Sequence, residues 1–145
     1  MGVLSDFIIA DRTEAAAINQ AKGGHLEQWT CLESKGIDSV KLGTLWAILS
    51  RTEYDPAFMD MDVCVLDQPS DEGPWLMLVP SKLVSAVAAL DGYLAKSVAR
   101  EWGKSEEFQM GGWSEDAVVE WFQDFIAFAQ TAQTAGKDLL LWMSL

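Results

Sequence analysis

The chain has 145 residues, half of them hydrophobic, and its formal net charge is −12 at pH 7 with the single histidine neutral. A chain of this length typically forms one domain and buries about two-thirds of its unfolded surface, so we expect a single domain over residues 1–145. Disorder is excluded by the hydrophobic content. Nucleic acids and anionic membranes are disfavoured as partners, because negative charge on both sides repels.

The cysteine usage and the N-terminal residues indicate the compartment. Cys31 and Cys64 both lie among apolar neighbours. We interpret them as buried, reduced thiols, since two cysteines make no disulfide framework. The first ten residues lack a basic segment and contain only a short apolar run, which excludes a signal peptide. These features predict a cytoplasmic protein.

The first half of the chain alternates between apolar runs and helical patterns. Residues 7–10 read as a strand, and the Ala-rich residues 12–21 predict a helix that Asp11 can cap. Residues 27–32 are ambiguous between a short strand and an irregular segment. A second helix is expected from Asp38 or Ser39 to about Arg51, and residues 52–62 are expected to form a loop.

The second half begins with two β-branched or apolar runs, residues 63–66 and 75–79, separated by turn-forming residues. They predict neighbouring strands or a hairpin. Helices are expected over 82–90 and 93–102, and a loop over 104–113. Ser114 should cap the longest helix, which should end before Gly136, and the apolar C-terminal residues predict a strand in the middle of a sheet.

The order of these elements defines a fold class. Strands and helices are interspersed without regular alternation, so we expect an α+β domain with a mixed β-sheet packed against helices. A long C-terminal helix should precede a buried terminal strand. Three tryptophans, Trp46, Trp121 and Trp142, fall on apolar faces and are expected in the core.

Three segments of the chain carry a resemblance to a known family. They are residues 37–49 (IDSVKLGTLWAIL), residues 78–84 (LVPSKLV) and the C-terminal residues 136–142 (GKDLLLW). In this order they are similar to segments of the YfbM-like family of small bacterial proteins, over about residues 37–145. This chain has Ala47 where the family helix has His after Trp. The resemblance implies an α+β cytosolic domain. It does not suggest any particular activity, because the family is uncharacterised.

Two long stretches of the chain, residues 52–81 and 105–136, hold 13 of the 22 carboxylates. Neither stretch contains a Lys or Arg. Trp75 and Trp113 stand beside Gly- or Pro-containing loops at the edges of these stretches. We therefore hypothesise a non-catalytic, immunity- or inhibitor-like module that binds a basic protein through an acidic, Trp-bordered face. Its residues would be Asp60, Asp62, Asp67, Asp71, Glu72, Trp75 and Trp113. Two unrelated solvated faces are the simpler interpretation.

Enzymatic and structural alternatives remain open. Asp60, Asp62 and Asp67 offer hard oxygen ligands for Mg²⁺, which would suit a divalent-metal-dependent hydrolase, although the EF-hand pattern is absent. Cys31 with His25 could form a nucleophilic pair. No glycine-rich phosphate-binding motif occurs, and we expect no cofactor. A third alternative is a homodimeric scaffold that buries its Trp-rich loops; the sequence leaves open whether the protein is a monomer or a homodimer.

Overall fold

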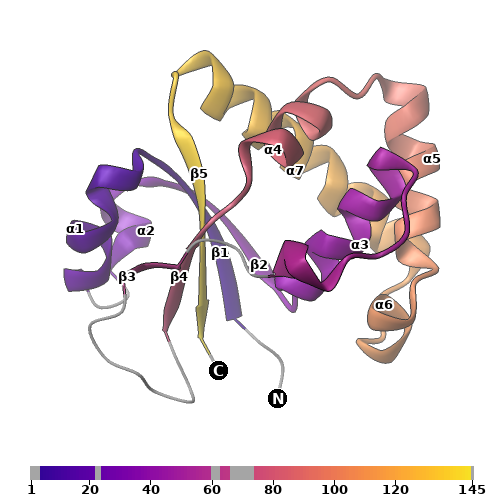
Figure 1. Cartoon of the computed structure of the whole chain (residues 1–145), viewed down its shortest axis with the longest axis horizontal. Helices are drawn as coiled ribbons and strands as arrows, with labels where there is room; N and C mark the ends of the chain where they lie inside the picture. Colours follow the sequence, from indigo (N-terminus) through magenta and orange to yellow (C-terminus); the bar gives the residue numbers. More distant parts are fainter. Residues whose placement is uncertain (1–3, 22–23, 60–62, 66–73, 145) are drawn as a thin grey trace.

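A five-stranded sheet with strand order β2-β1-β5-β4-β3 lies at the centre of the computed structural model, which describes residues 4–21, 24–59, 63–65 and 74–144 (Figure 1). The strands are β1 (Leu4–Ala10), β2 (Thr30–Lys35), β3 (Val63–Val65), β4 (Trp75–Leu78) and β5 (Asp138–Ser144). Every pairing between them is antiparallel. The terminal strand β5 lies between β1 and β4, as its wholly apolar sequence predicts.

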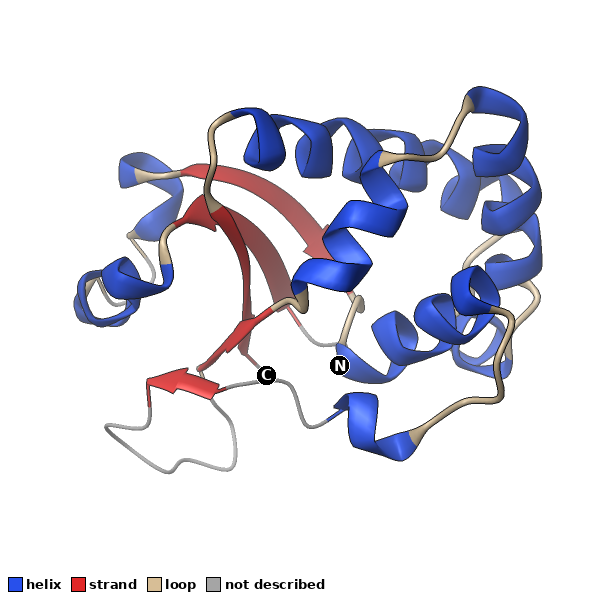
Figure 2. Ribbon diagram, turned by 45° about the horizontal axis from the view of Figure 1, so that its top comes forward, coloured by secondary structure: helices blue, strands red, loops and turns tan. Residues whose placement is uncertain are grey.

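Helices cover the two faces of the sheet unequally (Figures 1 and 2). The larger layer contains α3 (Ser39–Ser50), α4 (Ser81–Ala88), α5 (Gly92–Gly103), α6 (Glu106–Met110) and α7 (Glu115–Thr134). A 3₁₀ turn, η2 (Pro56–Met59), packs beside α3. Among the described residues, the helices on the other face are the short η1 (Arg12–Glu14), α1 (Ala15–Gln20) and α2 (His25–Gln28). In the described part of the chain, long helices therefore cover one face, and short helices cover one end of the other.

The alternation of side chains along β1 divides the core into two clusters. Phe7 and Ile9 belong to the main cluster under the large helical layer, whereas Ile8 and Ala10 belong to a small cluster with Ile18 of α1. This is the period of two that places successive strand residues on opposite faces. Both clusters are buried, so β1 is apolar on both faces along the part that helices cover.

Local signals set the helix boundaries where the sequence indicated them. The Asp38 carboxylate accepts a hydrogen bond from the Lys41 N–H at 2.9 Å, and Ser114 Oγ accepts one from the Ala117 N–H at 3.1 Å. At the other end of α7, Gly136 has a φ of +68°. That left-handed conformation suits glycine, which has no Cβ, and it reverses the chain into β5.

The α+β class and the long helix before a terminal strand are confirmed, but several details of the expected fold are wrong. The sheet is antiparallel and not mixed, because the helical segment between β4 and β5 begins and ends at the same end of the sheet. Residues 104–113 contain the helix α6, and the predicted helix over 12–21 is broken into η1 and α1. The tryptophans expected in the core, Trp46, Trp121 and Trp142, are each half-buried against it.

Candidate ligand-binding site

Most residues of the predicted acidic face lie outside the described part of the chain: Asp60, Asp62, Asp67, Asp71 and Glu72. Its two tryptophans are described and half-buried. Trp75 begins β4 and pairs with Met143 of β5, while Trp113 follows α6 and meets the Phe108 ring edge-on with centroids 5.3 Å apart. Each indole packs against the main core. The acidic face therefore stays a prediction.

The predicted Cys31–His25 pair is close in space but is not arranged for catalysis. The Cys31 thiol lies 3.6 Å from the main-chain carbonyl oxygen of His25 and 3.4 Å from that of Trp29, so it donates to backbone oxygens. Burial, and then the negative charges of Asp6 and Glu33, raise the pKa of the Cys31 thiol to about 11. A nucleophilic cysteine needs a lowered pKa, so this environment argues against a thiol enzyme.

Slow alkylation should reveal this environment of Cys31. In a Cys64→Ser background at pH 8, Cys31 should react with iodoacetamide at least about 10-fold more slowly in the folded than in the urea-unfolded protein. A pKa two units higher lowers the thiolate fraction about 100-fold, and the greater nucleophilicity of the more basic thiolate regains about 10-fold. Mass spectrometry would follow the reaction, and the rate should climb up to about pH 11. Equal rates for folded and unfolded protein would contradict this assignment.

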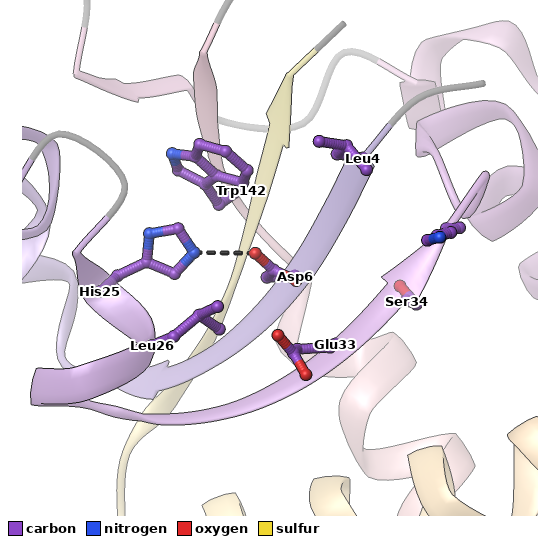
Figure 3. A pocket seen from close by; sticks show the side chains of 8 residues that line it. Leu4, Asp6, His25, Leu26, Glu33, Ser34 and Trp142 are labelled. Carbon is purple, nitrogen blue, oxygen red and sulfur yellow. Dashed lines mark hydrogen bonds and ion pairs between the residues drawn. The ribbon is translucent and has the colours of Figure 1, made fainter. Parts of the chain in front are cut away.

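The open end of the less covered sheet face holds a cavity of about 420 Å³ (Figure 3). We call it the sheet-face cavity. It is lined by side chains of β1, α2, β2 and β5: Leu4, Asp6, His25, Leu26, Glu33, Ser34, Lys35 and Trp142. Because α1 is short, it covers Ile8 and Ala10 but leaves the Leu4 end of β1 open. The cavity is thus a consequence of how little helix packs on this face.

Strand register places two carboxylates and an indole in a row across the cavity. Asp6 of β1 stands opposite Glu33 of β2 on one side and opposite Trp142 of β5 on the other. Directly paired residues in an antiparallel sheet project from the same face. The row therefore runs from an exposed carboxylate through a buried one to an indole.

The Asp6 carboxylate is fixed by His25. Asp6 Oδ2 lies 2.8 Å from His25 Nε2, and the two residues are 9% and 1% exposed. The imidazole lies against Trp142, with ring centroids 4.5 Å apart. His25 Nδ1 is buried and has no hydrogen-bond partner among the described residues. A buried polar pair of this kind gives the cavity a rigid and polar floor.

Glu33 differs from Asp6 in having no hydrogen-bond or ion-pair partner among the described residues. Its side chain is exposed, and in the described part of the chain it makes no hydrogen bond and no ion pair. Lys35, two residues along β2, lines the same cavity but also forms no ion pair with the described carboxylates. The cavity therefore presents one carboxylate that is free to bind a cation.

The described residues do not form a metal centre. No group of three or more His, Cys, Asp or Glu side chains among them is arranged to hold a metal ion. Asp6, His25 and Glu33 thus share a cavity without forming a chelating set. The predicted metal ligands Asp60, Asp62 and Asp67 lie outside the residues that the structure describes, and that site stays a prediction.

The fold and its open cavity define an α+β protein with one sparsely covered sheet face. No protein-family model and no curated protein matches the chain. Among solved structures the chain is similar to "a Protein of Unknown Function YfbM from Escherichia coli", with 16% sequence identity and a TM-score of 0.46 over 97% of this chain and 99% of that one. YfbM is also the protein named in the family that three sequence segments resemble. Among the described residues, no helix has the length and apolarity needed to cross a membrane.

Proposed function

We propose that this protein is a non-catalytic binding module that takes a small organic molecule in the sheet-face cavity. The observation that carries the proposal is the cavity of about 420 Å³ built over the hydrogen-bonded Asp6–His25 pair and bordered by Trp142. Ligand sites typically combine apolar and aromatic walls with a few fixed polar groups, at volumes of roughly 300–1,000 Å³. This cavity has that size and composition.

The groups around the cavity support binding more than catalysis. His25 Nε2 is committed to Asp6, and its ring is almost completely buried. Ser34 Oγ bonds to Ser5, to both its hydroxyl and its carbonyl oxygen at 2.9 Å, with no base beside it. A nucleophile needs an adjacent base or a lowered pKa; Ser34 Oγ is bonded to Ser5, and the pKa of Cys31 is raised.

A fragment screen by thermal shift tests this function. Leu26 lies at the cavity and is 42% exposed, so Leu26→Trp should fill the opening without disturbing the core. A fragment at ten times its Kd should raise the melting temperature of the native protein by roughly 3–6 °C. It should lose at least about 10-fold in affinity with Leu26→Trp.

Met110→Trp is the matched control, because Met110 is exposed on α6 and does not line the cavity. It should bind every fragment as the native protein does. The proposal fails if no fragment gives a saturable shift, or if binding survives Leu26→Trp unchanged.

A basic protein is the second candidate partner, supported by the exposed side of α7. Asp116, Glu120 and Asp124 follow one another at intervals of one helical turn, and all three are exposed. In the described part of the chain none of them forms an ion pair. A line of like charges of this kind accelerates encounter with a cationic surface. The acidic, Trp-bordered face around residues 60–75 and Trp113 remains part of this proposal.

Charge neutralisation on α7 tests the second candidate against a simple effect of net charge. The variant Asp116→Asn/Glu120→Gln/Asp124→Asn should bind a decalysine peptide about 10-fold more weakly at low ionic strength, with a flatter salt dependence. The control changes three exposed carboxylates on other elements, Glu27→Gln/Glu53→Gln/Glu101→Gln, and alters the net charge equally. Equal weakening in both variants would contradict a localised face. The metal-dependent hydrolase stays a prediction, since Asp60, Asp62 and Asp67 lie outside the described residues, and the homodimer also stays a prediction.

A further inference from the structure

We propose that the sheet-face cavity selects an amphipathic amine, that is, a protonated amine joined to an aromatic or branched apolar body. This inference rests on the proposed binding function of the same cavity. It follows from the row Glu33–Asp6–Trp142, which places negative charge on one side of the cavity and an aromatic ring on the other.

The negative side consists of two carboxylates that face each other across β1 and β2. Asp6 and Glu33 are directly opposite in the antiparallel register. Side chains in such positions have Cβ atoms about 4.5–5.5 Å apart, and like charges there destabilise the sheet. His25 holds the Asp6 carboxylate by a hydrogen bond, whereas Glu33 forms no ion pair in the described part of the chain, although Lys35 lines the same cavity two residues away. A bound ammonium group would relieve this repulsion.

The neighbouring Cys31 thiol lies within reach of the same two carboxylates. Cys31 stands beside Glu33 on the same face of β2, two residues away, and opposite Ile8. Asp6 and Glu33 both raise the pKa of its thiol, after burial as the largest cause. The two carboxylates therefore act together on groups placed over this part of the sheet. An anionic ligand would meet the same repulsion.

The other side of the cavity is apolar and open. Trp142 borders it, and Leu4 and Leu26 remain about half exposed although both are large hydrophobic side chains. An aromatic or branched body would cover these surfaces, and the face of an indole also attracts ammonium groups. A bare metal cation would leave them uncovered, and the described residues offer no chelating group of three. An amine with an apolar body satisfies both sides.

Calorimetric titration with three isosteric probes tests the inference at pH 7 and low ionic strength. The probes are 2-phenylethylamine, 2-phenylethanol and 3-phenylpropanoate, which share a ring and differ in charge. The native protein should bind the amine at least about 10-fold more tightly than the alcohol, and the acid more weakly than either. Glu33→Gln keeps the shape of an exposed side chain and should abolish the preference for the amine. Raising the salt concentration should weaken only the amine.

Glu120→Gln serves as the control, since it removes the same charge from α7 on the opposite face of the sheet and should keep the preference. Equal binding of amine and alcohol would overturn the amine inference and leave the binding function intact. So would an amine preference that persists in Glu33→Gln, or failure of all three probes while fragments bind in the thermal-shift screen. Failure of every fragment in that screen would overturn both.

Discussion

Replacing Trp102 by alanine should lower the free energy of unfolding by about 4 kcal/mol, because truncating a large buried aromatic side chain removes its burial and leaves a cavity. Trp102 is completely buried between α3, α6 and α7. Its ring meets Phe108 edge-on at a centroid distance of 4.8 Å and Phe122 at 5.5 Å. Its indole N–H donates to the Lys41 carbonyl at 2.9 Å. Trp102 therefore ties α5 to α3, α6 and α7.

Urea denaturation followed by circular dichroism would measure the change. Tyr93→Ala is the matched control, since Tyr93 lies on the same helix α5 and is 83% exposed. It should change stability by less than about 0.5 kcal/mol. Trp102→Phe should fall between the two, because it keeps most of the ring but loses the hydrogen bond to Lys41. A loss below about 1 kcal/mol for Trp102→Ala would show that the site collapses around the missing ring.

The elements that the sequence predicted well have long, regular patterns or unambiguous end signals. The helix α7 carries an apolar stripe over five turns, a Ser114 cap and Gly136 beyond its end. The terminal strand contains the uninterrupted apolar run of residues 139–143, which suffices to place it in the middle of the sheet. Patterns of this kind depend only on residues that are close together in the sequence, so they can be recognised before the fold is known.

The elements that the sequence did not reveal are short or lie at an edge. The strand β2 is exposed along one side of the sheet, so its residues show no clean alternation between apolar and polar. The five-residue helix α6 depends on Phe108, which is buried among rings contributed by α5 and by Trp113. Tertiary packing determines both elements, and no local sequence pattern predicts them.

The sheet-face cavity was not predicted, because its chemistry arises only from register. Asp6, Glu33 and Trp142 are far apart in the sequence and become neighbours through the pairing of β1 with β2 and with β5. The sequence suggested His25 only as a partner for Cys31, and it did not point to Asp6 as the residue that His25 binds. One signal was available: Asp6 is a charged residue next to an apolar strand in a chain with a single histidine. That signal would have placed the polar pair but not the cavity.

The second large effect expected is at the Asp6–His25 pair itself. His25→Leu should lower the free energy of unfolding by about 3 kcal/mol at pH 7, because it leaves a largely buried carboxylate with no partner. Asp6→Val should lower it by about 2 kcal/mol, since an unpaired imidazole is less costly to bury than an unpaired carboxylate. Each single variant therefore loses the hydrogen bond and also leaves the remaining polar group buried without a partner, which adds a desolvation cost.

The double variant Asp6→Val/His25→Leu removes both polar groups. Its loss in free energy of unfolding should be about 2 kcal/mol smaller than the sum of the two single losses. Urea denaturation of all four proteins gives this coupling energy. The Ser5–Ser34 hydroxyl pair is the internal control, because it also ties β1 to a neighbouring element, the strand β2, at 2.9 Å but with neutral groups, and its coupling should stay below about 1 kcal/mol. Strictly additive losses at Asp6 and His25 would mean that the pair is not coupled. Coupling between Asp6 and His25 would mean that the Asp6 carboxylate is held in place before any ligand binds. Additive losses would remove this support for the binding function.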